Sequence, residues 1–498
     1  MRDHKLTRRQ TVGLMAGATA ALLTRSALPA SALLAGAQAN RSLSDPQKAI
    51  RGTVIPKGSP AFELARQSMV WNKRVCQVRS PDAIVQVASA QDVVAAVKYA
   101  RANGLKVAIR GSGHNYHGAA LRDGGLLLDL SRLKSIDINA QHRRASVQPA
   151  VKGGDFAAAL ASHGLAFPVG HCSDVGLSGY ILNGGFGWNF GEWGPACMSV
   201  TGVEMVTAAG DLVYADEKHN AELLWAAHGA GPGFFAVATR YDVVLQPLRP
   251  AIRTYAVTFD LQSASIISKW LAPAIRSVHP TVEVVCTLGP IDATGTPVIV
   301  VSAVAFASSQ AEATARIAPL TSLPTGATLI GQPIDQPSTF KEILQLTDAG
   351  CPGNKRMAGD QLWSGASLGE LMSVVQHLAP GAPPAPSAIT LVSLGGGVQP
   401  SLIPSPEKAA LSKGGGSFIG AYAFWDDPAQ DNASRAWVHS VIRAAEPYGA
   451  GNYIGEADLS ASPQRARDCF SPAAWNQLVA LRRKFDPDGR FFSYLTEA

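Results

Sequence analysis

Several features that would assign the 498-residue chain to a common class are missing from its sequence. Only 16% of the residues are charged, and lysine and arginine form no cluster interleaved with aromatic residues, which argues against a nucleic-acid-binding surface. The six cysteines include no Cys-x-x-Cys pair and no set with the spacing of a zinc site. No apolar run after the N-terminal segment is long enough to span a membrane. We therefore expect no metal site, no membrane span and no nucleic-acid partner.

The size and charge of the chain set broader limits. A length of 498 residues exceeds what one core usually supports and predicts two or three domains. The apolar content of 47% is typical of a globular protein. Most of the formal net charge of +6 lies in residues 1–37, which carry +4 and leave only +2 for the remainder. The net charge therefore says little about binding partners.

The N-terminal segment has the layout of a bacterial export signal. Arg8 and Arg9 precede an alanine-rich apolar run, and small-residue sites follow at residues 30–32 and 35–37. The arginine pair indicates the twin-arginine route, so we expect residues 1–37 to be removed and the protein to reach the periplasm or the outside of the cell. The alternative is a disordered basic tail with an amphipathic helix. The twin-arginine machinery carries folded proteins, so a cofactor can be loaded before export.

Strand and helix patterns divide the rest of the chain into an α+β arrangement. Residues 38–78 read as a linker and the start of the first domain, and residues 79–250 mix strands and helices without a strict βαβ rhythm. From about residue 251, strands such as "PVIVVSAVAF" and helices such as "SASIISKWLAPAIRSV" predict an antiparallel sheet covered by helices on one face, over residues 251–450. Residues 451–498 end in an amphipathic helix before a proline.

Two glycine-rich stretches are the strongest candidates for a functional site. The first is "RGSGHNYHG", residues 110–118, and the second begins "GHCSDVGLSGYILNGGFG" at residue 170. Neither contains a Walker loop or a Gly-x-Gly-x-x-Gly motif. Glycine allows close approach of the backbone and its N–H groups to an anionic ligand. Either stretch alone is equally well explained as a set of tight turns.

Together, the two stretches resemble the berberine-bridge-enzyme-like family of FAD-linked oxidoreductases, which have the vanillyl-alcohol-oxidase type of FAD-binding domain. Their key residues, His114 and Cys172, lie 58 residues apart. The resemblance continues through "VEMVTAAGDLV", "ELLWAAHGAGPGFFAVATRYDVVLQPL", "FWDDP", "GNYIGEADL" and "WNQLVALRRKFDPDGRFF". It implies a two-part FAD-binding domain of the PCMH type over residues 79–250, a substrate-binding domain over residues 251–450 and a C-terminal segment that returns to the FAD domain.

The resemblance also implies FAD bonded covalently at two points, to His114 at the 8α-methyl and to Cys172 at C6. Imidazole and thiol side chains are suitable nucleophiles for an activated flavin. The alternatives are a loop histidine and a buried structural thiol, and His117 and His171 read as neighbours of the anchors. The other residues expected to bind the cofactor are Arg110, Gly111, Ser112, Gly113, Asn115, Gly118, Val175, Gly176, Leu177, Gly179, Tyr180, Asn183, Gly184, Gly187, Phe235, Val237, Asn452 and Tyr453.

The implied reaction is hydride transfer from an alcohol, sugar or secondary metabolite to flavin N5, with removal of a hydroxyl proton by a base. Tyr116 matches an active-site tyrosine of the family. The base is open, because Ala450 stands where many members have tyrosine, and Trp193 replaces a second tyrosine. A solvated surface position is the alternative for the carboxylates among the candidates. These candidates are Glu192, Tyr422, Asp426 and Tyr448.

The electron acceptor is expected to be dioxygen. Leu177 matches a position that controls oxygen access in parts of the family, where a bulkier residue favours a dehydrogenase. A dehydrogenase with another acceptor and a flavin-bearing binding protein of low turnover are therefore alternatives. A secreted metal-dependent hydrolase would need His114, His117 and His171 to converge on a metal, and no matching carboxylate motif supports it.

Overall fold

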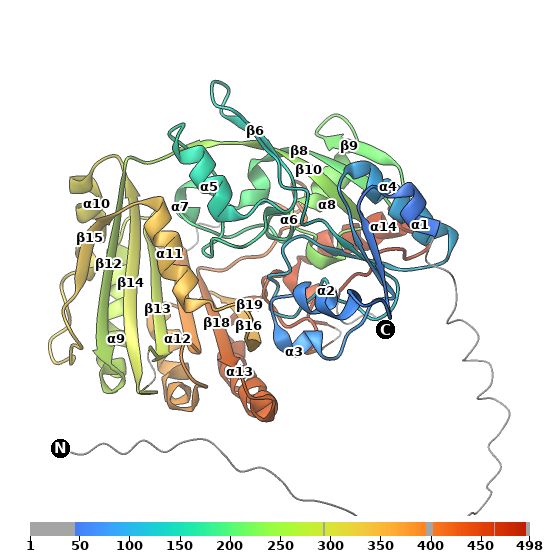
Figure 1. Ribbon diagram of the computed structural model, residues 1–498. Helices are drawn as coiled ribbons and strands as arrows, with labels where there is room; N and C mark the ends of the chain where they lie inside the picture. Colours follow the sequence, from blue (N-terminus) through green and yellow to red (C-terminus); the bar gives the residue numbers. More distant parts are fainter. Residues whose placement is uncertain (1–44, 292–293, 395–401, 463, 495–498) are drawn as a thin grey trace, which may run out of the picture. The chain divides into compact units, whose positions relative to one another are not determined.

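A computed structural model describes residues 45–291, 294–394, 402–462 and 464–494 (Figure 1). The export signal predicted over residues 1–37 lies outside the described residues. Within the described part of the chain, the strands form two sheets in the first half, a short two-stranded ladder and one large sheet in the second half. No helix in these ranges is long and apolar enough to cross a membrane.

The first sheet carries the first glycine-rich loop at its edge. Its strand order is β1-β2-β4-β3, with β2, β4 and β3 parallel and β1 antiparallel to β2. Ser89 caps the helix packed on this sheet by accepting from Asp92 N–H, and Gly104 follows the helix at φ +66°. The elements are α1 (Asp45–Ala49), β1 (Thr53–Pro56), α2 (Phe62–Ser68), α3 (Lys73–Cys76), β2 (Ala83–Gln86), α4 (Ala90–Ala102), β3 (Val107–Arg110) and β4 (Leu126–Asp129).

The second sheet is antiparallel, with the order β5-β6-β10-β8-β9, and it supports the second glycine-rich stretch. A two-stranded ladder of β7 and β11 lies apart from it. The elements are β5 (Ile136–Asn139), β6 (Arg144–Val147), α5 (Gly153–Ala161), β7 (Leu165–Ala166), α6 (Leu177–Leu182), α7 (Phe190–Trp193), β8 (Val200–Thr207), β9 (Leu212–Asp216), α8 (Ala221–Ala227), β10 (Ala236–Val244) and β11 (Gln246–Pro247).

The third sheet is antiparallel throughout, in the order β15-β12-β14-β13-β17-β18-β16-β19. The elements are β12 (Ala251–Asp260), α9 (Ala264–Ser277), β13 (Glu283–Pro290), β14 (Pro297–Ala307), α10 (Gln310–Ile317), β15 (Ile334–Ser338), α11 (Phe340–Gly350), β16 (Arg356–Ser364), α12 (Leu368–Val375), β17 (Ala388–Leu394), β18 (Ser417–Trp425), α13 (Asp431–Ala445), β19 (Gly449–Gly451) and α14 (Pro472–Phe485).

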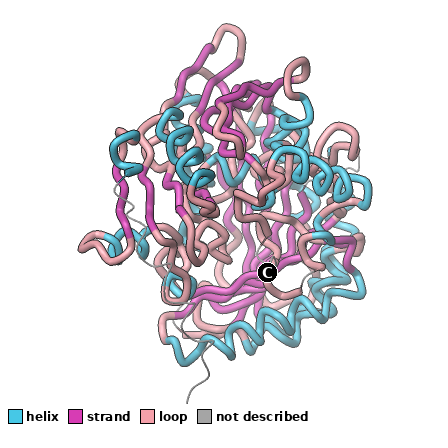
Figure 2. The backbone as a smooth tube through the Cα atoms, turned by 90° about the vertical axis from the view of Figure 1, so that its right-hand side faces the viewer, coloured by secondary structure: helices cyan, strands magenta, loops and turns pink. Residues whose placement is uncertain are grey.

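Side-chain alternation gives this large sheet two different faces. Helices α9, α10, α12 and α13 cover one face with a closed hydrophobic core, to which Val284, Cys286 and Leu288 of β13 contribute. Figure 2 shows the same arrangement from the side, with helices along the outside of the lower strands. The residues between them, such as Val285 and Thr287, point to the opposite face. The predicted antiparallel sheet with helices on one face is confirmed, and its uncovered face borders the candidate site.

The C-terminal residues pack against the first sheet. Phe491 forms a parallel bridge with Val107, and Phe492 N–H donates to the Val107 carbonyl at 3.0 Å. The Arg490 guanidinium donates to the Leu105 carbonyl at 2.6 Å. The side chain of Phe491 is fully buried in the core beneath α4. The last described residues are therefore part of the core around β3, directly before the first glycine-rich loop.

Replacing Phe491 by alanine is expected to lower the free energy of unfolding by about 3–5 kcal/mol, because a large buried side chain leaves a cavity in a close-packed core. Urea denaturation followed by circular dichroism measures the loss. The exposed Leu64→Ala variant is the control and should change stability by about 0.5 kcal/mol or less. Equal stability of the two variants would contradict a structural role of the C-terminal segment.

Candidate functional site

A cavity of about 880 Å³ lies between the two glycine-rich loops and the uncovered face of the large sheet. Residues from all parts of the described chain line it, so segments more than 300 positions apart meet there. Many residues expected from the sequence are among the lining residues. These are Gly111, Ser112, Gly113, His114, Asn115, Tyr116, Cys172, Val175, Gly176, Gly179, Tyr180, Asn183, Tyr422 and Tyr453.

The first loop presents unused backbone donors to this cavity. Within the described part of the chain, the N–H groups of residues 112–116 donate no hydrogen bond to another protein group. The loop is shaped from behind by the Arg110 guanidinium, which donates to the carbonyls of Met69 and Ser112 and forms an ion pair with Asp129 at 2.9 Å. A Cβ on Gly113, at φ +77°, would collide with the Met69 carbonyl. The loop can therefore approach an anionic group with several N–H donors.

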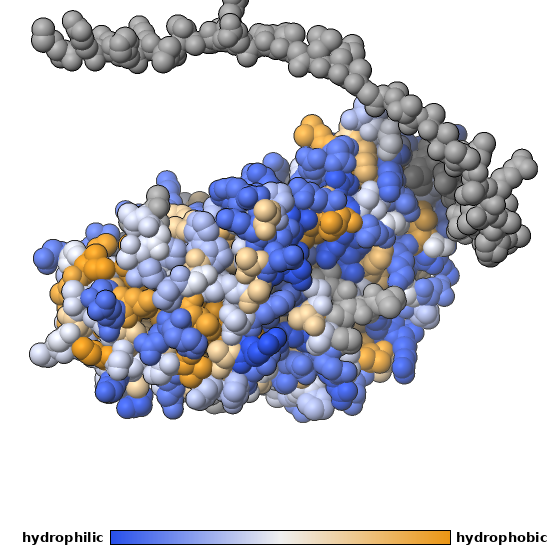
Figure 3. Space-filling view, turned by 90° about the horizontal axis from the view of Figure 1, so that it is seen from below, coloured by the Kyte–Doolittle hydropathy of each residue, from blue (hydrophilic) through white to orange (hydrophobic). Residues whose placement is uncertain are grey.

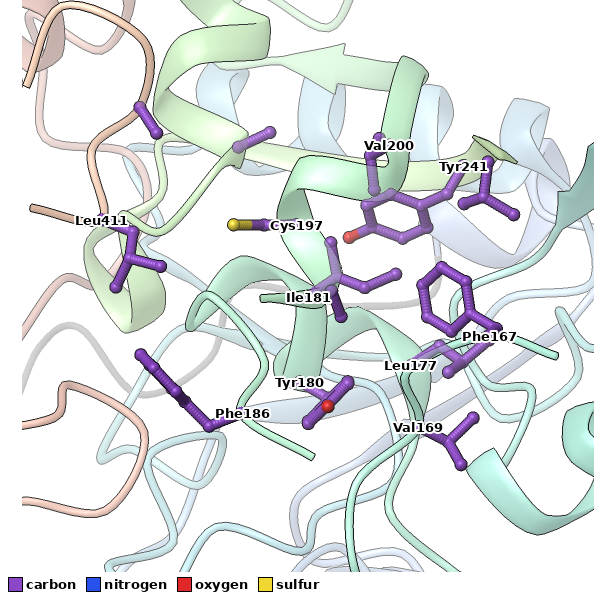
Figure 4. Packing of buried hydrophobic residues seen from close by; sticks show 14 of the residues in the cluster. Phe167, Val169, Leu177, Tyr180, Ile181, Phe186, Cys197, Val200, Tyr241 and Leu411 are labelled. Carbon is purple, nitrogen blue, oxygen red and sulfur yellow. The ribbon is translucent and has the colours of Figure 1, made fainter. Parts of the chain in front are cut away.

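The second loop is joined to the first loop and anchored in a hydrophobic core. Gly176 N–H donates to the Ser112 hydroxyl at 3.0 Å. Figure 4 shows Leu177 and Ile181 of α6 pointing into the core, and Leu177 is only 1% exposed. The Tyr180 hydroxyl donates to the Pro168 carbonyl at 2.7 Å, so its ring forms a fixed part of the cavity wall. The helix thus holds the loop at a constant distance from residues 112–116.

His114 is held by an aromatic ring and a carboxylate. The Trp71 ring stacks on its imidazole at a centroid distance of 4.0 Å. Its Nε2 lies 3.0 Å from Asp174 Oδ1, across the gap between the two loops. Burial alone would raise the pKa of Asp174, but its contact with His114 contributes to holding that pKa below the ordinary value. Nδ1 of the imidazole forms no hydrogen bond or ion pair with another described residue.

Cys172 has a second thiol beside it. Hydrogen bonding with Cys351, together with burial, raises the pKa of Cys172, whereas the same contact lowers the pKa of Cys351. Helix α11 places Cys351 there, because its last turn is fastened to the second loop. Asp348 accepts from Ser173 N–H and Oγ at 2.7 and 2.6 Å, and Thr347 donates to the His171 carbonyl.

A row of buried polar groups crosses the cavity from the first loop. The Tyr116 and Tyr422 rings lie 5.4 Å apart, and the Tyr422 hydroxyl donates to the Glu456 carboxylate. Burial raises the pKa of Glu456 above its ordinary value, although the hydrogen bond from Tyr422 acts in the opposite direction. Burial also raises the pKa of both tyrosines. The row therefore contains one carboxylate that can accept a proton and two hydroxyls that remain protonated.

Two glycines on neighbouring strands leave the space that the Tyr422 ring occupies. Gly359 of β16 lies opposite Tyr422, and Gly420 precedes Tyr422 by one full repeat on the same face of β18. A Cβ at Gly420 would come within 2.6 Å of the Tyr422 ring, and one at Gly359 within 3.2 Å of it and 3.4 Å of the Tyr116 ring. Larger residues at either position would displace the tyrosines that surround Glu456.

The backbone around Glu456 is tied to the first loop. The Asn115 amide donates to the Gly455 carbonyl at 3.1 Å, and His117 Nε2 lies 3.2 Å from the Glu456 carbonyl. His117 Nδ1 also lies 3.5 Å from Asp458. His117 is thus a structural neighbour of the loop, as the sequence predicts, and it helps to place Glu456 opposite His114.

His171 forms a separate ion pair on the cavity wall. Its Nε2 lies 2.7 Å from Glu283 at the start of β13, and its ring packs edge-on against Trp188. Burial alone would lower the pKa of His171, but Glu283 raises it above the ordinary value. No group of three or more histidine, cysteine or acidic side chains that suits a metal ion is found among the described residues.

Three candidates for the base do not reach the cavity. Glu192 accepts from Asn189 and forms an ion pair with Arg249. Asp426 pairs with Lys355 at 2.5 Å on the surface. Tyr448 is 41% exposed and lies outside the lining. The sequence could not separate these residues from Tyr422, because their distance from the cavity depends on strands that are remote in sequence.

Several residues expected to bind the cofactor do not line the cavity. Val237 packs in the core with Phe491, and Phe235 stacks on Phe485 at 6.0 Å, whereas Ala236 and Ala238 line the cavity. Successive strand residues face opposite sides, so the neighbours of Phe235 and Val237 face the cavity. The remaining residues that do not line the cavity hold the backbone around it. They are Arg110, Gly118, Leu177, Gly184, Gly187 and Asn452.

The sequence reasoning missed Glu456, Asp174, Cys351 and Glu283. Glu456 could have been found from the sequence, because it follows the Asn-Tyr pair closely in "GNYIGEADL". Asp174 had a weaker signal, two residues after Cys172. No sequence pattern points to Cys351 or Glu283, because they approach the second loop only through the packing of α11 and β13.

Comparison with known proteins defines the class of this fold. Residues 81–216 match a family described as an FAD binding domain. This range includes both glycine-rich loops, with His114, Cys172 and the free N–H groups. The chain therefore has an FAD-binding domain of the PCMH type, and the fold class expected from the sequence is confirmed.

One relative matches most of the chain, and another matches about two fifths of it. It is 27% identical over 428 residues to the FAD-linked oxidoreductase nodO of Hypoxylon pulicicidum, which is 84% of this chain and 92% of the relative. Over 199 residues, 40% of this chain and 42% of the relative, it is 38% identical to (R)-6-hydroxynicotine oxidase of Paenarthrobacter nicotinovorans. The chain is thus similar to FAD-linked oxidoreductases in both the cofactor half and the remaining half.

Solved structures share the whole fold. The crystal structure of 6-hydroxy-D-nicotine oxidase from Arthrobacter nicotinovorans has a TM-score of 0.76 at 25% identity and covers 89% of this chain and 96% of that chain. BBE-like 1 of Physcomitrella patens has a TM-score of 0.78 at 17% identity, with coverages of 90% and 97%. The arrangement of the three sheets is therefore shared with these two solved structures.

Proposed function

We propose that the protein is an FAD-dependent oxidoreductase that binds its flavin covalently through His114 and Cys172 and oxidises a CH–OH group. The observation that carries this proposal is that an imidazole and a thiol from different loops face one cavity, beside the unused N–H donors of residues 112–116. These donors suit the pyrophosphate of FAD, so the residues present fit the cofactor. FAD bound there would supply hydride acceptance.

The two attachment residues have different surroundings. Asp174 holds the Nε2 side of His114, which supports Nδ1 as the bonding atom. Cys172 must lose its proton to react, and its raised pKa makes this step unfavourable at neutral pH. The Cys351 thiol lies next to Cys172 as its hydrogen-bond partner.

The purified protein is expected to keep its yellow colour after acid precipitation. His114→Ala and Cys172→Ala should each leave the flavin bound by one remaining bond, and the double variant should release all of it into the acid supernatant. Absorbance of the washed pellet and the mass of the flavin peptide measure the attachment. Cys351→Ser, which changes the neighbouring thiol alone, is the matched control and should keep covalent flavin. Covalent flavin in the double variant would contradict the proposal.

We assign the proton-accepting role to Glu456. Its carboxylate lies in the cavity and accepts a hydrogen bond from the Tyr422 hydroxyl. Its backbone is tied through Asn115 and His117 to the loop that carries His114. The raised pKa makes Glu456 a stronger base than an exposed glutamate. Tyr116 is placed to orient the substrate hydroxyl, because it stays protonated between His114 and Tyr422.

Glu456→Gln is expected to lower kcat by about 10²-fold or more, because a positioned base contributes roughly that factor. In the wild type, kcat should rise with pH through the pKa of Glu456, since only the carboxylate accepts the proton. Tyr422→Phe removes a hydrogen bond that lowers this pKa, so the rising limb should move to higher pH. Asp426→Asn, a surface carboxylate paired with Lys355, should leave the limb in place. An unchanged pH profile in Tyr422→Phe would refute the assignment.

We further propose dioxygen as the electron acceptor, with Val175 controlling its access. Val175 lines the cavity, whereas Leu177 is buried in the core below the loop. Among the solved structures of this fold, wild-type Phl p 4.0202 is described as a glucose dehydrogenase and an isoleucine-to-valine variant of Phl p 4 as a glucose oxidase. A dehydrogenase with another acceptor is the alternative, and the larger Val175→Ile side chain distinguishes the two.

Val175→Ile is expected to slow reoxidation of the reduced flavin by oxygen at least about tenfold, corresponding to roughly 1.4 kcal/mol in the barrier. Stopped-flow mixing of reduced protein with oxygenated buffer measures the rate. Leu177→Ile is the control, because this side chain does not face the cavity. Slow reoxidation of the wild type would favour the dehydrogenase.

Export by the twin-arginine route is a further part of the proposal. It rests on Arg8, Arg9 and the small-residue sites within residues 1–37. Covalent attachment of the flavin would keep the cofactor on the protein after export to the periplasm or the outside of the cell.

A further inference from the structure

The uncovered face of the large sheet forms the wall of the cavity opposite the cofactor loops. Strand register places Ala256, Ser302, Val285 and Val392 side by side on β12, β14, β13 and β17. In the next row, Thr287 lies directly opposite Thr390. These side chains are all short, so they leave a broad surface of low polarity rather than a set of separate polar pockets.

Two of the hydroxyl groups on this wall are paired within the protein, and Thr287, Thr390 and the Gln336 amide remain for a ligand. The Thr254 hydroxyl is paired with Ser338 at 2.9 Å, and the Ser302 hydroxyl donates to the Val285 carbonyl at 3.4 Å. A buried hydroxyl of a ligand costs free energy unless it finds a partner. A sugar would bring many hydroxyls to a wall on which two of the polar side chains already bond to protein. The wall therefore suits a ligand with few polar groups.

The charged groups argue against an anionic ligand. The basic side chains that line the cavity among the described residues are His114, Arg122 and His171. His114 is beside Asp174 and His171 is beside Glu283, while Arg122 donates to the carbonyls of Ala119 and Ser493. None of the strands β12, β13, β14, β17 and β18 contributes a lysine or arginine to the lining. A phosphate or carboxylate would thus find no cation on the sheet.

Large apolar side chains surround the opening of the cavity. Ile291, Ile334 and Leu346 line it and are nevertheless 55, 51 and 59% exposed. They come from the end of β13, the start of β15 and helix α11. Figure 3 shows hydrophobic patches over the half of the molecule that carries the large sheet, and further patches over the other half. Exposed apolar groups next to a binding cavity are favourable contacts for an apolar ligand.

We propose that the substrate is an uncharged, mainly apolar alcohol, whose carbon skeleton lies along the sheet and whose single hydroxyl reaches Glu456. This inference rests on the proposed function and names its substrate class. Glu456 would accept the hydroxyl proton, and FAD, when bound, would supply hydride acceptance from the same carbon, so the product would be a ketone or aldehyde. Dioxygen, as the proposed acceptor, would take up the two electrons with two protons and leave as hydrogen peroxide.

The test uses the flavin-loaded protein under anaerobic conditions and three probes. These are a bicyclic secondary alcohol without other polar groups, cellobiose as a sugar, and glycolate as an anionic alcohol. Bleaching of the flavin absorbance measures reduction, and a shift of the absorbance without bleaching measures binding. We expect the apolar alcohol to reduce the flavin with a kcat/KM at least about 100-fold above that of either other probe, a factor within the range of pocket-based discrimination.

A matched pair of surface variants tests the binding wall. Ile334→Asp places a charge at the opening and should raise KM for the apolar alcohol about tenfold, with kcat and the flavin content unchanged. Leu212→Asp changes a similarly apolar exposed residue on β9, away from the cavity, and should leave KM unchanged. Equal KM values in the two variants would overturn the proposal.

The outcomes separate the substrate class from the reaction. Preference for cellobiose or glycolate would overturn the substrate class and leave the oxidoreductase function intact. An absorbance shift with the apolar alcohol, but no bleaching by any probe, would support the substrate class and contradict the alcohol oxidation. No shift and no bleaching with the apolar alcohol would overturn the inference, whatever the other probes do.

Discussion

The hydrogen bonds between the first glycine-rich loop and residues 455–456 are the constraint on which the site depends. Asn115 and Gly455 are 340 positions apart, yet their bond holds the C-terminal part of the chain against the loop that carries His114. Asn72 adds a second link, because its amide donates to the carbonyls of Tyr116 and Met357 at 2.7 and 3.0 Å. These contacts join the cofactor loops to the large sheet and bring Glu456 to the cavity.

Glu456 lies in the cavity, whereas Ala450 does not. β19 lies at the edge of the large sheet, and Ala450 is exposed there, outside the cavity lining. The carboxylate in the cavity comes instead from Glu456, in the turn after the Asn-Tyr pair. Gly359 and Gly420 make this arrangement sterically feasible, because the Tyr422 ring rests where their side chains would be. The hydrogen bond between Tyr422 and Glu456 thus depends on the same two neighbouring strands.

The large sheet serves two purposes through one alternating pattern. Its covered face builds a closed hydrophobic core with α9, α10, α12 and α13, which stabilises the sheet. Its other face has short, weakly polar residues and remains available for a ligand. Helix α11 lies on this second side and connects it to Cys172 through Ser173 and Asp348. The second loop and the cavity-facing side of the sheet are therefore joined through helix α11.

The sequence by itself determined the local features, because they depend on neighbouring residues. Strand alternation, helix caps, the two glycine-rich loops and the order of His114 and Cys172 were predictable, and so was the α+β class. Only the tertiary structure decided which of the several carboxylates and tyrosines line the cavity. In the sequence, Glu192 and Glu456 are both simply glutamates. Packing places Glu192 against Arg249 and Glu456 against Tyr422. Such distances are set by strand order and register, which local patterns do not encode.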